Sequence, residues 1–280
     1  MSANDYNRAV SNSFIGFWKK RFSTVHRTRH LIWQLFIISL TNQYKKTFLG
    51  SVWIVLGPIL SITIWLILNY TGIYSPGETK VPYLGYLLLS MSIWIFFTNF
   101  FKLIATSVTE SGSMLMEMPF DMEAKIVEKI LMSMVSFAIP LVLNIVVLLL
   151  LGVSFSWSAL LFFPTIIPLI LLGITIGVFV SLIEVVFNDI LLIAAQGLTL
   201  LMYLTPVVYT DRVSSDLLQS VIRVNPLTYL LGVPRNLLVG EEVTQWNEFW
   251  IATGVTVLLF LIVIHLFFGS VYKIVERIFD

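Results

Sequence analysis

The sequence contains no cysteine and very little charge. Its 280 residues include no thiol, so a disulfide framework, a thiolate metal site and a thiol nucleophile are all excluded. Charged residues make up only 12% of the chain, whereas soluble domains carry about 25%. With 58% hydrophobic residues and a mean hydropathy of +0.91, the composition indicates a protein embedded in a lipid bilayer.

The sequence also lacks the common catalytic and nucleotide-binding motifs. It has no GxxxxGKS or GxxxxGKT phosphate loop, no HExxH pair and no GxSxG elbow. We therefore expect no enzymatic activity and no cofactor in this chain, and energy for uphill transport has to come from a partner or an ion. His26 and His30 are spaced i, i+4, but no carboxylate lies nearby and the surrounding arginines repel cations, so we predict no metal site. The net charge of +1 suggests no nucleic-acid partner.

Long charge-free runs indicate membrane-spanning helices. A helix needs about 20 apolar residues to cross about 30 Å of hydrocarbon. The run 130–183 is too long for one helix, and the polar, turn-like segment 152–158 divides it into two. The sequence therefore predicts an all-α membrane protein with six spans, at about 49–70, 82–101, 130–151, 159–184, 190–210 and 249–270.

The basic residues are distributed unevenly between the two sides of this topology. An even number of spans puts both termini on one side, and that side carries thirteen of the 17 lysines and arginines. By the positive-inside rule both termini are cytoplasmic. The polar, basic first 30 residues do not fit a signal peptide, so the first span directs insertion, with Lys45 and Lys46 at its membrane boundary. The other side carries Lys80, Arg212, Arg223 and Arg235.

Residues 1–46 form a cytoplasmic N-terminal region before a transmembrane domain at 47–272 and a cytoplasmic tail at 273–280. The apolar patch Arg29–Leu40 is too short to span and is flanked by basic residues. This pattern favours an interfacial amphipathic helix in contact with membrane lipid. The alternative is part of a soluble helix that packs under the bundle.

The cytoplasmic loop Lys102–Lys129 mixes methionine, phenylalanine and acidic residues around Pro119. Such a mixture is typical of a short amphipathic helix that offers adaptable apolar contacts to a soluble partner. The alternative is a solvated loop.

The outer segment Val213–Gly240 carries two helix signals. Asp216 is a candidate cap for one short helix, and Asn225-Pro226 breaks it before a second. Each half is too short to cross the bilayer, so we predict a pair of re-entrant or surface-lying helices.

Small or polar residues at helical spacing mark faces of spans turned toward protein or water. Gly173, Gly177 and Ser181 predict close helix packing of the fourth span. Aromatic rings beside hydroxyls suit a path for sugars, although aromatic belts and ordinary packing are the alternative for the second span. The candidate path residues are Ser51, Ser61, Trp65, Tyr83, Tyr86, Trp94, Phe97, Gln196, Thr199 and Tyr203.

Two acidic residues, Glu184 and Asp189, lie at the cytoplasmic ends of the fourth and fifth spans. Buried acids in membranes often bind ions or protons. At these positions snorkelling or helix capping accounts for them equally well, so a coupling-ion role is the less favoured interpretation.

Four segments together resemble the membrane subunit of type-2 ABC exporters, in particular the permeases for O-antigen, capsule and teichoic-acid polysaccharides. They occur in the same order over almost the whole chain. The segments are YKKTFLGSVWIVLGPIL (Tyr44–Leu60), FNDI (Phe187–Ile190), YLTPVVY (Tyr203–Tyr209) and VNPLTYLLGVPRNLLVG (Val224–Gly240).

The resemblance implies a homodimer in the bacterial inner membrane with two copies of a separate ATPase that binds ATP and Mg. It also implies a coupling helix between the second and third spans that docks on the ATPase, and an outer gate between the fifth and sixth. By position, the ATPase contact would comprise Glu117, Met118, Pro119, Phe120 and Asp121, and the gate Asn225, Pro226, Leu227 and Thr228.

The chain departs from the family pattern at two places. Acidic residues surround the coupling segment, so the ATPase groove is expected to be basic, and Asn188-Asp189 replaces the usual Arg-Asp. The resulting hypothesis is an ATP-driven exporter of a lipid-linked polysaccharide. Two alternatives remain: an exporter of a drug or small lipid with the same fold, and a membrane enzyme acting on lipid-linked sugars, for which Glu184 and Asp189 are the available acids.

Overall fold

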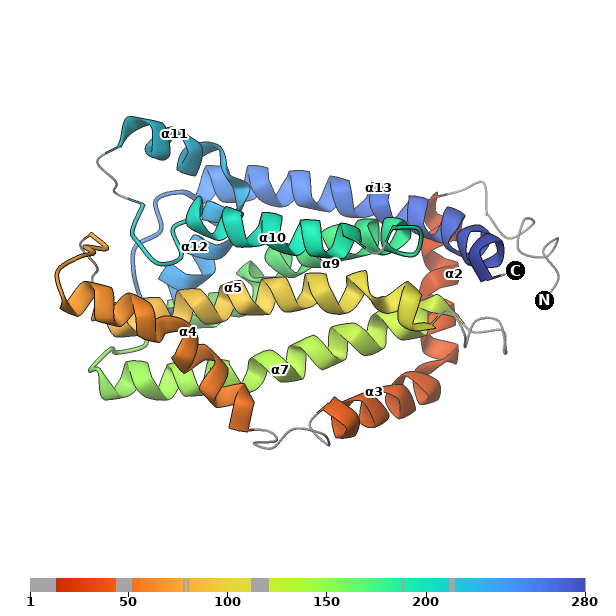
Figure 1. The fold of residues 1–280 in the computed structure, drawn as a ribbon, viewed down its shortest axis with the longest axis horizontal. Helices are drawn as coiled ribbons and strands as arrows, with labels where there is room; N and C mark the ends of the chain where they lie inside the picture. Colours follow the sequence, from red (N-terminus) through yellow and green to blue (C-terminus); the bar gives the residue numbers. More distant parts are fainter. Residues whose placement is uncertain are drawn as a thin grey trace.

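The computed structural model describes residues 14–43, 52–77, 79, 81–111, 121–187, 189–211 and 215–279. Every regular element in these ranges is a helix, which confirms the all-helical class (Figure 1). In chain order they are α2 (Phe14–Arg27), α3 (Arg29–Gln43), α4 (Trp53–Tyr70), α5 (Tyr83–Ala105), α7 (Met122–Leu150), η2 (Trp157–Leu161), α8 (Phe162–Thr165), α9 (Ile167–Glu184), α10 (Asp189–Tyr203), α11 (Asp216–Val224), α12 (Pro226–Leu238) and α13 (Trp246–Phe279).

Four helical stretches are long and apolar enough to cross a bilayer. They are Tyr83–Ala105, Met122–Leu150, Trp157–Glu184 and Trp246–Val271, and they coincide with the predicted second, third, fourth and sixth spans. The first and fifth predicted spans coincide with shorter apolar helices, in α4 and α10. The chain is thus a multi-pass membrane protein, and the count of six remains a prediction.

Helix α5 lies at the centre of the bundle and packs against α4, α7, α9, α10 and α12. Its contact with α9 is close because glycine faces it. A Cβ added to Gly173 would lie 3.1 Å from the carbonyl oxygen of Phe97, and one on Gly177 would lie 2.8 Å from that of Phe101. The close packing predicted from these small residues is confirmed.

Helix α7 begins eight residues before the predicted span, at Met122 rather than near 130. Helices α2 and α3 pack against α7, Arg21 of α2 pairs with Glu123 in its first turn, and Met122 and Ala124 are fully buried. The prediction followed the apolar run, whereas the helix continues into a charged segment that other helices cover.

Two helices, rather than one, form the N-terminal region. Helix α3 matches the predicted interfacial segment, and it buries Ile32 and Phe36 while leaving Trp33 and Ile38 exposed. Helix α2 was not predicted; it crosses the end of the bundle where α13 ends, and Phe17 packs on His265 at a ring distance of 5.1 Å. Side chains thus join the N-terminal helices to the bundle.

Candidate functional site

Asn225 forms the elbow between α11 and α12. Its backbone is extended, and its Oδ1 accepts a hydrogen bond from the amide of Leu227 at 3.0 Å, so it caps α12. Its Nδ2 donates to Oγ1 of Thr205 at 2.8 Å and to the carbonyl of Leu204 at 3.2 Å. One side chain therefore ends one helix, begins the next and ties both to the end of α10.

The first turn of α12 holds α11 through two further hydrogen bonds. Thr228 donates to the carbonyl of Ile222 at 2.9 Å, and the Tyr229 hydroxyl donates to that of Arg223 at 2.7 Å. These contacts confirm the break at Asn225-Pro226 and the helix on each side of it. The four candidate gate residues are consecutive at this elbow, and Leu227 and Thr228 are buried there.

The segment after α10, residues 204–211, is attached to the rest of the bundle through Thr210 and through its backbone carbonyls. Thr210 donates to the carbonyl of Pro76 through its amide at 2.9 Å and its hydroxyl at 3.1 Å. Three tyrosine hydroxyls donate as well: Tyr74 to Val208 (3.2 Å), Tyr83 to Val208 (2.9 Å) and Tyr86 to Tyr209 (2.7 Å).

Burial raises the pKa of Tyr74 above its usual value, and neighbouring tyrosines raise it further. Its hydroxyl therefore stays protonated at neutral pH and remains a donor. Two aromatic candidate path residues at the first turn of α5, Tyr83 and Tyr86, thus also supply hydrogen bonds to this segment.

Arg235 on α12 lies at the centre of this region with only 7% of its surface exposed. Its Nη1 donates to the Tyr86 hydroxyl at 2.7 Å, to the carbonyl of Pro206 at 2.9 Å and to Oγ of Ser90 at 3.3 Å. Its guanidinium also lies 4.4 Å from the centre of the Tyr86 ring. No salt bridge among the described residues includes Arg235, so neutral acceptors and a ring stabilise a buried charge.

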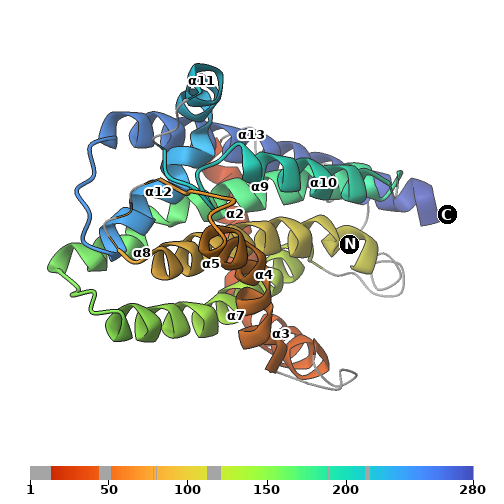
Figure 2. The ribbon, with the colours of Figure 1, turned by 60° about the vertical axis from the view of Figure 1, so that its left-hand side comes forward.

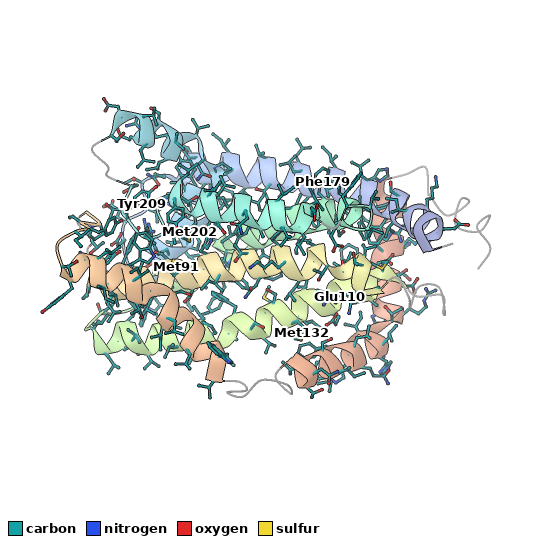
Figure 3. All side chains as sticks on the ribbon, viewed as in Figure 1. Met91, Glu110, Met132, Phe179, Met202 and Tyr209 are labelled. Carbon is teal, nitrogen blue, oxygen red and sulfur yellow. The ribbon has the colours of Figure 1, made fainter. Side chains whose placement is uncertain are left out.

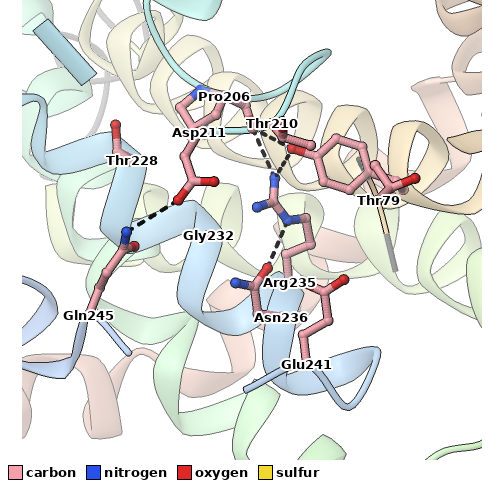
Figure 4. A pocket seen from close by; sticks show the side chains of 11 residues that line it. Thr79, Pro206, Thr210, Asp211, Thr228, Gly232, Arg235, Asn236, Glu241 and Gln245 are labelled. Carbon is pink, nitrogen blue, oxygen red and sulfur yellow. Dashed lines mark hydrogen bonds between the residues drawn. The ribbon is translucent and has the colours of Figure 1, made fainter. Parts of the chain in front are cut away.

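In the sequence, Arg235 counts only as one of the four basic residues on the side opposite the termini. The signal that could have revealed it is the spacing of Thr228, Gly232 and Arg235, which places small and polar residues on one face of an otherwise apolar helix. That face borders a cavity of about 270 Å³ between α12 and the 206–211 segment (Figure 4). Figure 2 shows α12 among α5, α8 and α13.

Ion pairs gather at the opposite end of the bundle, around the first turns of α7. Arg21 pairs with the buried carboxylate of Glu123, and Arg27 pairs with Asp121 at 3.0 Å. The Arg21 guanidinium also lies 4.1 Å from the centre of a phenylalanine ring on α13, Phe268. Helix α2 is therefore joined to both α7 and α13.

Glu110 and Lys129 form a third ion pair at this end, at 2.6 Å. Partial burial by itself raises the pKa of Glu110, but hydrogen bonds from Lys129 and Thr106 and the charge of nearby Lys125 outweigh it, so the pKa is lowered. Figure 3 labels Glu110 at this end and Tyr209 at the other. Glu184, also buried, accepts a hydrogen bond from Thr109.

The candidate path residues fall into separate groups. Gln196, Thr199 and Tyr203 share an exposed side of α10. The Trp65 ring of α4 lies 6.2 Å from that of Tyr203, while the Ser61 hydroxyl donates to its own helix at 2.8 Å. This group lines the surface of α4 and α10.

Trp94 and Phe97 are instead buried inside the helical bundle. Their ring centres are 5.5 Å apart, with 4% and 0% of their surfaces exposed. Phe97 packs against Gly173 of α9. Several residues of interest lie outside the described residues: Lys45, Lys46, Ser51, Glu117, Met118, Pro119 and Phe120.

Comparison with known families identifies the chain. Residues 30–239, most of its length, match the family described as ABC-2 type transporter. The chain belongs to this family. The matched range includes the elbow at Asn225 and the residue Arg235, and it ends just after α12, before Glu241 and Gln245 of the cavity lining. The family named from the sequence is confirmed.

One relative of this ABC-2 type transporter chain is the O-antigen export system permease protein RfbA of Myxococcus xanthus. It is 22% identical to this chain over 185 residues, which are 66% of this chain and 70% of the relative. ABC-2 permeases are transport subunits that work with ABC ATPase partners. Family membership therefore removes support from the alternative of a membrane enzyme.

Proposed function

We propose that this ABC-2 permease moves a lipid-linked polysaccharide from the cytoplasm across the bacterial inner membrane, driven by ATP hydrolysis on a separate ATPase. The observation that carries the proposal is the similarity to an O-antigen export permease over most of both chains. The division of the bundle into a charged end and a polar, hydrogen-bonded end supports it.

The charged end is the proposed cytoplasmic end. Asp121 is the last residue of the candidate ATPase contact, segment 117–121, and it pairs with Arg27. A force on that segment would therefore reach α7 directly and α2 through the two ion pairs. Through Arg21 it would also reach α13. We infer that these helices respond together when the ATPase subunits close.

The opposite end is the proposed outer end, where the elbow at Asn225 acts as a gate. Its hydrogen bonds to Leu204 and Thr205 join it to α10, so a shift of α10 would move α11 and α12 with it. Exposed polar residues of α10 then connect the gate with the translocation path. In this proposal Gln196, Thr199 and Tyr203 line that path.

The exposed surfaces of α4 and α10 support a homodimer. Ile64 of α4 and Ile193 of α10 are 54% and 65% exposed, and polar Gln196 and Thr199 lie among the exposed apolar residues of α10. Polar side chains facing lipid are unfavourable. A second copy placed against these helices would cover the apolar residues and enclose the polar ones.

Export can be tested by co-expressing the chain with its cognate ATPase in a bacterium whose own polysaccharide permease is deleted. We expect surface polymer to return only when both subunits are present and the ATPase hydrolyses ATP. Lipid-linked polymer that stays inside the cell, despite an assembled and active complex, would contradict the proposal.

A smaller lipid or drug is the second candidate substrate. An apolar hollow of about 530 Å³ between α10 and α11 favours it, with Leu201, Leu204 and Val221 in its lining. In the same cells, ATP-dependent loss of a fluorescent lipid without any surface polymer would favour this alternative.

A further inference from the structure

The cavity beside Arg235 is lined by groups that can both donate and accept hydrogen bonds. Asn236 and Gln245 contribute amides, Thr210 and Thr228 contribute hydroxyls, and Asp211 contributes a carboxylate that accepts from Gln245 at 3.3 Å (Figure 4). Polar groups that line a cavity in a mostly apolar bundle cost free energy when they have no hydrogen-bond partners. Its chemistry therefore indicates a hydrophilic ligand.

One donor of Arg235 remains available to such a ligand. Nη1 and Nε are used by Tyr86, Ser90, Pro206 and Asn236, but no hydrogen bond joins Nη2 to a described residue. Gly232 leaves room on that side, since a Cβ added there would lie 3.8 Å from Nη2. A buried guanidinium thus presents a fixed donor at the wall of the cavity.

The cavity lining carries charges of both signs, so an ion of either sign meets repulsion from at least one group. Asp211 and Glu241 disfavour an anion, and Arg235 disfavours a cation. A neutral group with many hydroxyls meets no repulsion and can satisfy carboxylates, amides and guanidinium together. The volume of about 270 Å³ is slightly below that of pockets for drug-sized ligands, and it suits one monosaccharide ring.

Recognition here would depend on hydrogen bonds rather than stacking. Tyr86 is the aromatic residue of the cavity lining, and the Arg235 guanidinium already covers a face of its ring at 4.4 Å. The described lining of this cavity therefore presents no free aromatic face on which a sugar could stack, although the sequence suggested stacking for sugars.

We infer that the cavity between α12 and the 206–211 segment binds a neutral hexose unit. The inference rests on the proposed function for the origin of that unit, a residue of the exported chain that reaches the outer end of the bundle. A free saccharide outside the membrane has the same chemistry and is the other possible source.

Binding can be measured on the full chain in lipid nanodiscs by saturation-transfer NMR with methyl α-D-glucopyranoside. We expect saturation transfer to the wild type and at least about fivefold weaker affinity in Glu241→Ala/Gln245→Ala, which removes two polar contacts without touching Arg235. A matched control, Glu242→Ala/Gln219→Ala, removes the same side chains outside the cavity and should bind as the wild type does.

Three results would overturn the inference: no saturation transfer to the wild type, equal affinity in the cavity variant, or equal affinity for the corresponding methyl glucuronide. In export-competent vesicles, inhibition by hexoside added to the outer side, absent in the cavity variant, would identify the exported chain as the source. Binding without inhibition would identify a free saccharide. Hexoside binding that depends on the cavity, in a chain that exports no polymer, would refute the proposed function and leave the site established.

Discussion

Arg235 on α12 donates a hydrogen bond of 2.7 Å to the hydroxyl of Tyr86 on α5, and its guanidinium lies 4.4 Å from the centre of the same ring. The Tyr86 hydroxyl in turn donates to the carbonyl of Tyr209 at 2.7 Å. Three parts of the chain that are far apart in sequence therefore meet at one phenol.

Replacing Tyr86 by phenylalanine keeps the ring and removes the hydroxyl. We expect it to lower the free energy of unfolding by about 1–3 kcal/mol, because the guanidinium and a buried carbonyl each lose a partner. The thermal midpoint of the purified chain measures this effect. Tyr70→Phe is the matched control, since Tyr70 is 93% exposed, and an equal midpoint in the two variants would show that the phenol contributes nothing.

Two substitutions at Asn225 separate its two roles. Asn225→Asp keeps an oxygen that caps α12 but loses the amide that donates to Leu204 and Thr205. Asn225→Ala loses the cap as well as the donor, and loss of the cap alone costs about 1 kcal/mol. We expect faster amide hydrogen exchange in α11 for both variants, and in the first turn of α12 for Asn225→Ala only. Unchanged exchange in α11 for Asn225→Asp would reject the link to α10.

The two ion pairs of α2 provide a comparison between a buried and an exposed pair on the same helices. The Glu123 side chain is 3% exposed and its partner Arg21 13%, while those of Asp121 and Arg27 are 37% and 71% exposed. We expect Glu123→Ala to cost about 3–5 kcal/mol, because it leaves a largely buried arginine unpaired. Asp121→Ala should cost at most about 1 kcal/mol.

Thermal unfolding of both single variants and of Arg21→Met/Glu123→Leu checks this difference. The double variant removes both charges, so it should recover most of the stability lost in Glu123→Ala. If Asp121→Ala proves as unstable as Glu123→Ala, burial does not determine the strength of these pairs.

Trp65 and Trp94 are predicted to give different phenotypes, although both are candidate path residues. Trp65→Ala should reduce surface polymer while the complex with the ATPase still assembles, because the residue is half-buried beside Tyr203. Trp94→Ala should destabilise the chain itself by about 3–5 kcal/mol, because its side chain lies in the core. Trp157→Ala, at an 86% exposed position, is the control, and full export by Trp65→Ala would remove Trp65 from the path.

The contact of Glu110 with Lys129 predicts a pH dependence of stability. The folded-state pKa of Glu110 lies below its ordinary value of 4.5, so its stabilising contribution is present above about pH 4.5 and is lost as pH falls through the lowered value. Thermal midpoints of the wild type and Glu110→Gln should therefore differ at neutral pH and converge in acid. A constant difference across this range would show that ionisation of Glu110 does not contribute.

The sequence was most informative where one physical effect dominates. Charge-free runs predicted the apolar helices, and Asn225-Pro226 predicted the elbow, because burial and proline geometry act locally. It was least informative for α2, whose lysines and arginines lower its mean hydropathy. The residues that pack, Phe17, Arg21 and Thr24, follow helical spacing but differ in chemistry.

Arg235 and the tyrosines show a second limit. A count of charges assigns an arginine in a short connecting segment to water, and only the fold shows that Tyr86, Ser90 and Pro206 surround it. The tyrosine acceptors are backbone carbonyls, which every residue has. No side-chain pattern in residues 204–211 therefore predicts the hydrogen bonds from the tyrosines.

This property of the 204–211 segment affects how the protein can change during evolution. Because Tyr74, Tyr83 and Tyr86 donate to main-chain oxygens, these hydrogen bonds do not depend on which side chains occupy positions 208 and 209. Val207 and Val208 are buried, so they tolerate apolar residues of similar size, whereas half-buried Tyr209 can vary more widely while the hydrogen bonds stay in place. The three tyrosines have no such freedom, so related permeases can vary one partner of this contact while the other stays constant.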